Sequence, residues 1–417
     1  MTATVPREEV RSTGSVLGHW NSAVTTYYLT TGATGLLVAL GLVMVLSSSA
    51  ISSIAESGSP YGVFLRQAQY ALIGLVVMFV ASRLSVPVLR RLAWPALLFA
   101  IALQMLVFTP LGRAEGGNRN WVYLGGTAFQ PSEVVKLGLA LWLGAVLARK
   151  RPLLREWRHA VIPAIPVAGL AVGVVLLGHD LGTALIMLAL VAGAMFVGGV
   201  PMRVFGVAGV AAAATVTLLV LAGNKRVERI MSWLSTDCDL QVACYQPKHG
   251  TWALGSGGVF GMGLGASREK WHYLPAAHND YIFAIIGEEL GLVGTLLVLT
   301  LFGLLAAAFL RLVARHPDPF VKVSTAAIGS WVIGQALVNI AVVIGLAPVV
   351  GIPLPLVSAG GSALIVTMAA MGVVIAFARS EPGAAEALAA RPGVLRRSLA
   401  VLGRPGAADP APGRTRG

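Results

Sequence analysis

The stretch "HNDYIFAIIGEELGLVG", residues 278–294, continues without interruption into "TLLVLTLFGLLAAAFL", residues 295–310. An apolar run of about 20 residues is long enough to cross the hydrocarbon core of a bilayer as a helix. Asp280 precedes this run, and Glu288 and Glu289 lie inside it. The stretch therefore predicts a membrane-spanning helix. Each carboxylate in it needs a partner, a proton or a wet cavity, because a bare charge at that depth is costly.

The composition of the whole chain is that of a polytopic membrane protein. Of its 417 residues, 56% are hydrophobic and 12% are charged, whereas a soluble domain carries about 25% charged residues. Because apolar runs of membrane-spanning length recur along the chain, we predict an all-α fold with about ten transmembrane helices. The predicted spans lie near residues 33–51, 67–84, 93–110, 132–148, 160–177, 181–199, 203–223, 281–310, 322–346 and 358–378.

These spans divide the chain into a membrane domain and two tails. Residues 1–29 form a polar tail without the pattern of a cleavable signal peptide. Residues 30–380 form the membrane domain, in which residues 224–280 are a large loop between the seventh and eighth spans. Residues 381–417 are rich in Ala, Gly, Pro and Arg, and we expect this tail to be disordered.

The basic residues indicate which side of the membrane each segment faces. The side that holds both termini carries 21 of the 31 Lys and Arg residues, the other side carries 9, and Lys136 lies in a span. Because Lys and Arg accumulate in cytoplasmic loops, we expect a multi-pass plasma-membrane protein with both termini in the cytoplasm and the 224–280 loop outside it. The net charge of +13 then reflects topology and attraction to anionic lipids, and we expect no nucleic-acid partner.

Two interpretations of Asp280 are open. Asp is a favoured N-cap residue and could simply begin the helix. Alternatively, the carboxylate takes part in chemistry, because it lies at a helix mouth beneath the long outer loop and next to the polar residues His278 and Asn279. Gly287 and Gly291 share its face of the predicted helix at 100° per residue, so we expect another group to approach this face closely.

The two glutamates of the same span point in other directions. Glu288 lies about 80° and Glu289 about 180° from Asp280 around the helix axis. A hydrogen bond to another helix and a direct part in chemistry are both open for each of them. We expect Glu289 to find a structural partner in another helix.

Several residues at the outer face could bind an anionic or sugar ligand. Lys136 lies about one turn inside the fourth span, and it could pair with Glu133 three residues earlier or bind a phosphate. Lys270 is an outer-loop cation that could serve the same anion. Trp121 lies at a membrane boundary, where Trp is common, and could equally stack on a sugar ring.

The chain has two cysteines, Cys238 and Cys244, both in the outer loop. In an oxidising compartment they could form a small disulfide loop, and two free thiols are equally open. No set of residues with metal-ligand spacing surrounds them or the histidines.

Three long motifs resemble the signature regions of the SEDS family, which comprises the FtsW, RodA and SpoVE proteins. The motifs are "NRNWVYLGGTAFQPSEVVKL", "KWHYLPAAHNDYIFAIIGEELGLVG" and "IGLAPVVGIPLPLVSAGGSALI". The resemblance extends over residues 30 to 380, and it is greatest to the FtsW branch, which acts in cell division. A fourth stretch, "GHDLGTAL" at residues 178–185, resembles a family segment but has His179 where Gln or Pro is usual.

The resemblance assigns roles to individual residues. Asp280 matches the family's essential Asp, and Trp121 matches an important Trp of an outer loop. The remaining matches are to the motif of span four, which includes Pro131, and to the segment before span ten. They imply substrate-binding residues at Gln130, Ser132, Glu133, Lys136, Ser358, Gly360, Gly361 and Ser362. To these we add Lys270, His278 and Glu288 as candidate substrate-binding residues.

The resemblance also implies a reaction. It is the polymerisation of lipid II into β-1,4-linked peptidoglycan strands on the outer face of the membrane, at the division septum. Asp280 would act as general base on the acceptor hydroxyl, and undecaprenyl pyrophosphate would leave. Lys136 and loop arginines, or a divalent cation, would meet the charge of the leaving group. The implied partners are a class B penicillin-binding protein, which is a transpeptidase, and other cell-division proteins.

Two other functions fit the same sequence. A transporter that flips lipid II would also place charged residues within ten spans, and a scaffold for division proteins would need no chemistry. Formation of glycan polymer by the purified protein distinguishes the enzyme from both alternatives. Movement of lipid II across vesicles without polymer would favour the transporter.

The predicted topology can be tested with single cysteines in a Cys-less chain. One cysteine replaces Gly116 in an outer segment, and the other is placed in the tail of residues 381–417. Because the two positions are predicted on opposite sides of the membrane, an impermeant thiol reagent applied to intact cells should label only the first. Equal labelling of both positions would contradict the ten-span topology.

Overall fold

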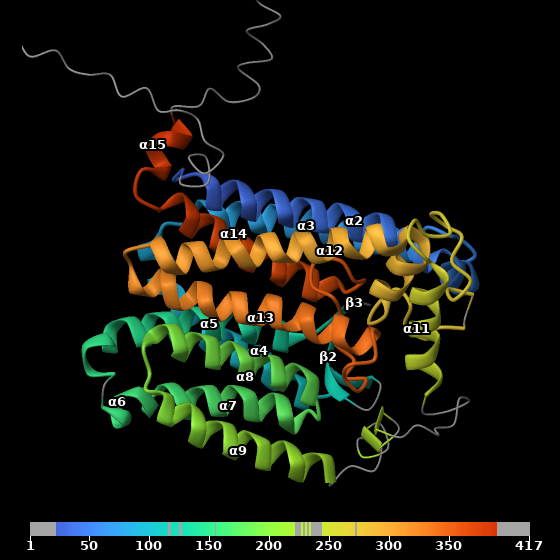
Figure 1. Cartoon of the computed structure of the whole chain (residues 1–417). Coiled ribbons are helices and arrows are strands. Elements are labelled where there is room, and N and C mark those ends of the chain that lie inside the picture. Colours follow the sequence, from blue (N-terminus) through green and yellow to red (C-terminus); the bar gives the residue numbers. More distant parts are fainter. Residues whose placement is uncertain are drawn as a thin grey trace, which may run out of the picture.

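The computed structural model describes residues 22–115, 118–124, 127–154, 156–221, 227, 230, 231, 233, 234, 244–271 and 273–389. Its long helices lie side by side in one bundle, with a small sheet and helix α11 (Tyr245–Ser256) at one end and α15 (Ala384–Ala389) at the other (Figure 1). Cys238 and the 1–21 and 390–417 segments lie outside the described residues.

Eight helices in the described part of the chain are long and apolar enough to cross a membrane. Two shorter apolar helices bring the set to the ten spans predicted from the sequence. The eight are α2 (Thr25–Ser57), α3 (Gly62–Arg83), α4 (Val86–Met105), α5 (Pro131–Lys150), α8 (Leu181–Gly198), α12 (Ile282–Arg315), α13 (Pro319–Val343) and α14 (Gly361–Arg379), and the two shorter helices are α7 (Ala164–Leu177) and α9 (Met202–Leu221). The predicted helical membrane fold is thus confirmed.

Several predicted boundaries were wrong. Helix α2 begins at Thr25, inside the predicted 1–29 tail, and α15 is a helix in the tail that we expected to be disordered. The predicted fifth span is divided into the short helix α6 (Trp157–Val161) and α7, because Pro163 stands at the N-cap of α7 and interrupts the helical run. Two 3-10 turns, η1 (Leu106–Phe108) and η2 (Arg151–Leu153), follow α4 and α5.

A three-stranded antiparallel sheet follows η1, where the sequence analysis expected only an outer segment. It consists of β1 (Gly112–Glu115), β2 (Asn118–Leu124) and β3 (Thr127–Phe129), with Val122 opposite both Gly112 and Phe129. The backbone N–H of Arg119 donates to the oxygen of Gly178 at 2.8 Å. This bond fixes β2 to the turn between α7 and α8, so the sheet has a defined position over that end of the bundle.

Helix α5 is the central helix of the bundle. Fifteen of its side chains are buried, and it packs against α4, α8 and α13. Two glycines allow these close contacts: a Cβ at Gly138 would lie 3.1 Å from the Ala96 oxygen, and one at Gly144 would lie 1.9 Å from the Ser324 hydroxyl oxygen. A helix enclosed in this way places every polar side chain of its first turns inside the protein.

The end of the bundle near α15 holds a group of polar residues. Arg311 donates to the Thr26 hydroxyl and to the Ser22 oxygen. Just outside the membrane-spanning segments, burial lowers the pKa of His316 and raises the pKa of Glu381. These contacts join the first described turn of α2 to the ends of α12 and α14.

Helix α12 is interrupted at Gly291, where φ is 68° and ψ is −161°. The backbone of residues 258–263 lies against this break: the N–H groups of Leu292 and Val293 donate to the oxygens of Gly258 and Val259 at 3.0 and 3.2 Å. A Cβ at Gly291 would lie 2.4 Å from the Gly261 nitrogen. The glycine face predicted on this helix therefore exists, but the protein's own loop occupies it rather than a ligand at Asp280.

The break predicts that Gly291→Ala is destabilising. A positive φ costs a residue with a side chain about 1–3 kcal/mol, and the new methyl group would also meet the loop backbone. We expect a clear fall in the midpoint of thermal unfolding in detergent.

Gly303→Ala is the matched control on the same helix, since no atom lies within 4 Å of a Cβ there. It should leave stability unchanged or raise it by up to about 1 kcal/mol. Equal midpoints for Gly291→Ala and the parent chain would show that the break is not required.

Candidate functional site

A cavity of about 530 Å³ lies where the sheet, α5, α8 and the start of α12 meet. Seven of the residues predicted from the sequence line it, namely Trp121, Gln130, Glu133, Lys136, Asp280, Gly360 and Ser362. The other lining residues are Asn118, Asp180, Thr183, Ile186, Ala276, Asn279, Gln335, Val350, Gly351, Ile352, Pro353, Ala359 and Ala363. Tertiary structure thus brings residues of five distant segments to one site.

Asp280 lies in the cavity wall immediately before α12. The N-cap of α12 is Tyr281, and it has no side-chain cap hydrogen bond, so Asp280 lies one residue before the cap position. The Asp280 backbone oxygen accepts from Asn339 Nδ2 at 2.7 Å, and the same nitrogen donates to Ile352 at 2.8 Å. A Cβ at Gly351 would lie 3.7 Å from Asp280 Oδ2, so the carboxylate faces backbone that carries no side chain.

The segment before α14 holds the turn that carries Asp280 in place. Ser358 Oγ donates to the Asn279 oxygen at 2.7 Å, and the Ala359 N–H donates to the His278 oxygen at 2.9 Å. Ser358 therefore acts through the chain next to Asp280. His278, proposed as a binding residue, is fixed here through its backbone and is not among the residues that line the cavity.

Gly361 is required by a close approach to α3, since a Cβ there would lie 2.5 Å from the ring of Tyr70. Gly360 is joined to α3 through its backbone. Its N–H donates to Gln67 Oε1 at 3.2 Å, and Gln67 Nε2 donates to the Ser358 oxygen at 3.2 Å. The surroundings of Gly361 thus support a role in holding α14 against α3.

Lys136 and Glu133 form a buried ion pair on α5. Lys136 Nζ lies 2.8 Å from Glu133 Oε1, and the exposed fractions of the two residues are 1% and 3%. Lys136 also donates to Gln335 Oε1 at 3.1 Å and lies 4.7 Å from the centroid of the Trp331 ring. The predicted pair is confirmed, and the ammonium stays at the cavity wall instead of extending to the outer surface. The second carboxylate oxygen of Glu133 is buried without a hydrogen-bond partner.

Asp180 is a cavity carboxylate that sequence reasoning did not select. It caps α8, because Oδ1 accepts from the Thr183 N–H at 2.9 Å. Its Oδ2 accepts from Asn120 Nδ2 at 2.6 Å and from Gln130 Nε2 at 3.3 Å. The signal was present in "GHDLGTAL", but the unusual His179 led us to discount the segment.

The hydrogen bonds of Asp180 continue into the predicted motif of span four. Asn120 Nδ2 also donates to Ser132 Oγ at 2.8 Å, and Ser132 is fully buried. The Gln130 N–H donates to Ser362 Oγ at 3.1 Å. Ser132 thus lies behind the wall, while Gln130 and Ser362 join α5 to α14 at the cavity. Trp121 follows Asn120 on β2 and lines the cavity, which favours ligand stacking over the membrane-belt interpretation.

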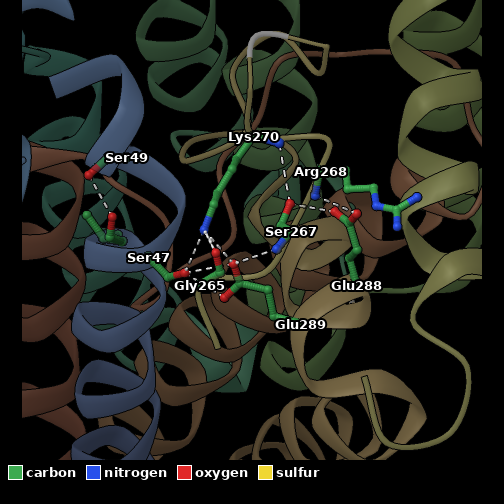
Figure 2. A network of polar contacts seen from close by, with 9 residues as sticks. Ser47, Ser49, Gly265, Ser267, Arg268, Lys270, Glu288 and Glu289 are labelled. Atoms are coloured by element: carbon green, nitrogen blue, oxygen red, sulfur yellow. Dashed lines mark hydrogen bonds and ion pairs between the residues drawn. The ribbon is translucent and has the colours of Figure 1, made fainter. Parts of the chain in front are cut away.

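Lys270 and Glu288 lie in a separate network, and the structure does not bring them to the cavity. Figure 2 shows this network, which joins Ser47 in the second half of α2 to the N-terminal part of α12 and to residues 265–270. Lys270 Nζ lies 3.1 Å from Glu289 Oε1, and Ser47 Oγ of α2 donates to both oxygens of Glu289. Ser267 Oγ and the Arg268 N–H donate to Glu288. The predicted interhelical partner of Glu289 is confirmed, whereas Glu288 binds the outer loop.

Two remaining expectations concern the cysteines and a cation. Cys244 is disulfide-bonded, but its expected partner Cys238 lies outside the described residues, so the pairing itself stays a prediction. Among the described residues no three His, Cys, Asp or Glu side chains come together as a metal site. The cavity carboxylates thus do not provide a ligand set for the divalent cation, and the cation stays an untested expectation.

Chemically, the cavity combines an acid–base group, a cation and a ring. Asp280 can accept a proton, Lys136 can meet an anion if it leaves Glu133, and Trp121 can stack on a sugar. Asp180 already accepts three or more hydrogen bonds and is therefore better suited to positioning Gln130 and Asn120 than to proton transfer.

Comparison with known proteins agrees with this architecture. Residues 28–382 match the family model for FtsW, RodA and SpoVE cell cycle proteins. The chain is 40% identical over 390 residues to the probable peptidoglycan glycosyltransferase FtsW of Mycobacterium tuberculosis, covering 92% of this chain and 74% of that protein. It is 35% identical over 347 residues to stage V sporulation protein E of Bacillus subtilis, covering 82% and 94%.

Solved structures share the fold. A chain of the structure "Structural coordination of polymerization and crosslinking by a peptidoglycan synthase complex" matches with a TM-score of 0.68 and 31% identity, covering 84% of this chain and 96% of that one. The crystal structure of the Thermus thermophilus rod shape determining protein RodA matches with a TM-score of 0.63 and 30% identity, covering 85% and 97%.

The fold and the cavity define a polytopic helical membrane protein with a polar site at one end of its bundle. The match over nearly the whole membrane domain identifies its family. The chain belongs to the FtsW, RodA and SpoVE family of cell cycle proteins.

Proposed function

We propose that this chain is a peptidoglycan glycosyltransferase that polymerises lipid II into β-1,4-linked glycan strands during cell division. The observation that carries the proposal is the cavity, in which Trp121 of β2, Lys136 of α5 and the distant Asp280 line one space. Relatives at up to 40% identity that carry the name peptidoglycan glycosyltransferase support the reaction class.

In the proposed mechanism Asp280 is the general base. Its Oδ2 takes the proton from the GlcNAc 4-hydroxyl of an acceptor lipid II. The oxygen attacks C1 of the donor MurNAc from the opposite side to the leaving group, so that the C1 configuration inverts. The bond from C1 to the pyrophosphate breaks, and undecaprenyl pyrophosphate leaves with the electron pair.

The leaving pyrophosphate needs positive charge, and Lys136 is the cation among the described cavity residues. In the free protein its charge is balanced by Glu133 at 2.8 Å. We propose that the substrate phosphate takes over part of this contact and that Gln335 and Trp331 keep the ammonium at the wall. Because no three His, Cys, Asp or Glu side chains of the described residues come together as a metal site, no step is routed through a metal ion.

The same proposal sets the location and partners of the chain. Lipid II is polymerised at the outer membrane face, so the cavity faces outward and both termini are cytoplasmic, in the plasma membrane at the division septum. A similar chain belongs to a peptidoglycan synthase complex described as coordinating polymerisation and crosslinking. We therefore propose a class B penicillin-binding protein as partner, together with other division proteins.

The lipid II flippase and the non-catalytic scaffold remain the alternatives to test. Either would leave Asp280 without a proton to accept. The decisive experiment is therefore a polymerisation assay with the purified chain and lipid II.

Asp280→Asn should abolish most of the polymerisation. Asn has nearly the same shape but cannot take the hydroxyl proton, and loss of a general base costs about 10²–10⁴ in rate. The variant should still fold, because the contacts that fix this segment use the Asp280 backbone oxygen. Thermal unfolding and lipid II binding should match the parent chain.

Glu386→Gln provides the control, since Glu386 is an exposed carboxylate on α15. It should polymerise lipid II like the parent. Polymerisation by Asp280→Asn at the parent rate would exclude Asp280 as the base. If the parent chain moved lipid II across the bilayer but formed no polymer, the proposed enzyme would be rejected in favour of the transporter.

Lys136→Met should lower both stability and activity. The change leaves Glu133 as a buried charge without its cation, and breaking a buried ion pair costs about 3–5 kcal/mol. The double variant Glu133→Gln with Lys136→Met removes both charges and should recover much of the thermal stability. It should not recover polymerisation, because the cation for the pyrophosphate is still missing. Recovery of both properties in the double variant would make Lys136 a purely structural residue.

A further inference from the structure

The segment Gly257–Ala266, here called the Gly-rich loop, has a surface unlike that of an ordinary outer loop. Its sequence "GGVFGMGLGA" has no charged residue. Its large side chains point outward: the exposed fractions are 55% for Val259, 84% for Phe260 and 60% for Leu264. Apolar groups exposed to this degree on adjacent residues indicate a binding surface.

The backbone of the Gly-rich loop is hydrogen-bonded as membrane-embedded backbone must be. At the break of α12 it accepts two hydrogen bonds, from Leu292 and Val293. It also donates two, from Met262 and Gly263 to the oxygens of Glu288 and Glu289 at 2.9 and 3.0 Å. Irregular backbone is tolerated at membrane depth only where such groups are satisfied within the protein.

Glycine is what permits this pairing. A Cβ at Gly261 would lie 2.1 Å from the Glu289 oxygen, and one at Gly257 would lie 1.9 Å from the Gly287 oxygen. The loop therefore lies directly against α12, with Gly257 and Gly261 at the contact and the side chains of Val259, Phe260 and Leu264 turned outward.

Helix α12 gives the depth of the loop. Residues 282–289 are buried in the protein, whereas Leu292, Val293 and Leu296 are exposed. The uncharged stretch from Leu292 to Leu310 rises roughly 28 Å at 1.5 Å per residue, which is close to the roughly 30 Å of the hydrocarbon core. The break at Gly291 thus lies at the edge of the hydrocarbon, and the Gly-rich loop lies there with it.

The residues next to the loop are those expected at the level of lipid headgroups. Trp252 of α11 and Trp271 and Tyr273 after the loop are exposed, and Trp and Tyr prefer this interfacial zone. Beside them the ion pair of Lys270 and Glu289 is buried in the protein (Figure 2). Because this ion pair is buried, its two charges can lie next to an apolar loop without contacting the hydrocarbon of the membrane.

We propose that the Gly-rich loop is a lipid anchor: Val259, Phe260 and Leu264 insert among the acyl chains of the adjoining leaflet, continuous with the lipid-facing surface of α12. Residues 267–280 lead from this anchor to the cavity, where Ala276, Asn279 and Asp280 form part of the wall. The anchor thus fixes the height of that wall relative to the membrane surface. This proposal goes beyond the proposed reaction, and it does not depend on which ligand the cavity binds.

The proposal can be tested with nitroxide labels on the full-length protein in liposomes of phosphatidylethanolamine and phosphatidylglycerol. A label is placed at Phe260→Cys, and its collision rates with oxygen and with a nickel complex present on both sides of the bilayer are measured. Leu296→Cys is the lipid-exposed control on α12, and Glu386→Cys is the water-exposed control on α15. The parent chain, carrying its native cysteines, is the labelling blank.

The ratio of oxygen to nickel collisions at position 260 should match that at 296 and exceed that at 386. A ratio like that at 386 would place the loop in water and overturn the proposal. Low collision rates with both reagents would also overturn it, because they would mean that protein, such as a second copy, covers the loop. Val259→Cys and Leu264→Cys carry the same expectation, so that one misfolded variant does not decide the result.

Discussion

A charge that is removed from water must be paired, and this constraint organises the polar part of the molecule. Two lysines meet two glutamates in the interior, Lys136 with Glu133 and Lys270 with Glu289. The first pair lies within one turn of α5 and lines the cavity. The second joins α12 to the outer loop, and Ser47 adds α2. Each pair avoids the several kcal/mol that an uncompensated buried ion costs, and each therefore fixes the segments that carry it.

The same requirement applies to the backbone. The chain leaves helical geometry at Gly291 and in the segment of residues 351–360. At Gly291 the freed backbone groups bind the Gly-rich loop, and at residues 352–359 they bind Asn339, Ser358 and the turn before Asp280. In both segments the groups that leave the helical pattern find partners within the protein. The second segment lines the cavity, whereas the break at Gly291 lies outside it.

The two ion pairs have different consequences for function. The Lys136 pair lies at the cavity wall, where an anionic ligand could compete with Glu133 for the ammonium. The Lys270 pair is enclosed by α2, α12 and the loop (Figure 2), so that a ligand would have to unfold the loop to reach it. The Lys136 pair is therefore the better candidate for a part in chemistry, whereas the Lys270 pair connects α12 to the outer loop.

The helical membrane fold with about ten spans, the family and seven of the residues that line the cavity follow from the sequence alone. They do so because membrane thickness sets the length of an apolar run, and because the motifs around Trp121, Lys136, Asp280 and Ser362 are local. Tertiary structure alone decided which polar residues face the cavity. Asp180 reaches it through contacts with Asn120 and Gln130, which are 60 and 50 residues away in the chain. Glu288 and Lys270 were assigned to the wrong network, because a helical projection cannot show a break at Gly291 or the loop that fills it. The short sheet was missed for a similar reason: strands of 3 to 7 residues are defined by their pairing across the chain, not by any pattern within one of them.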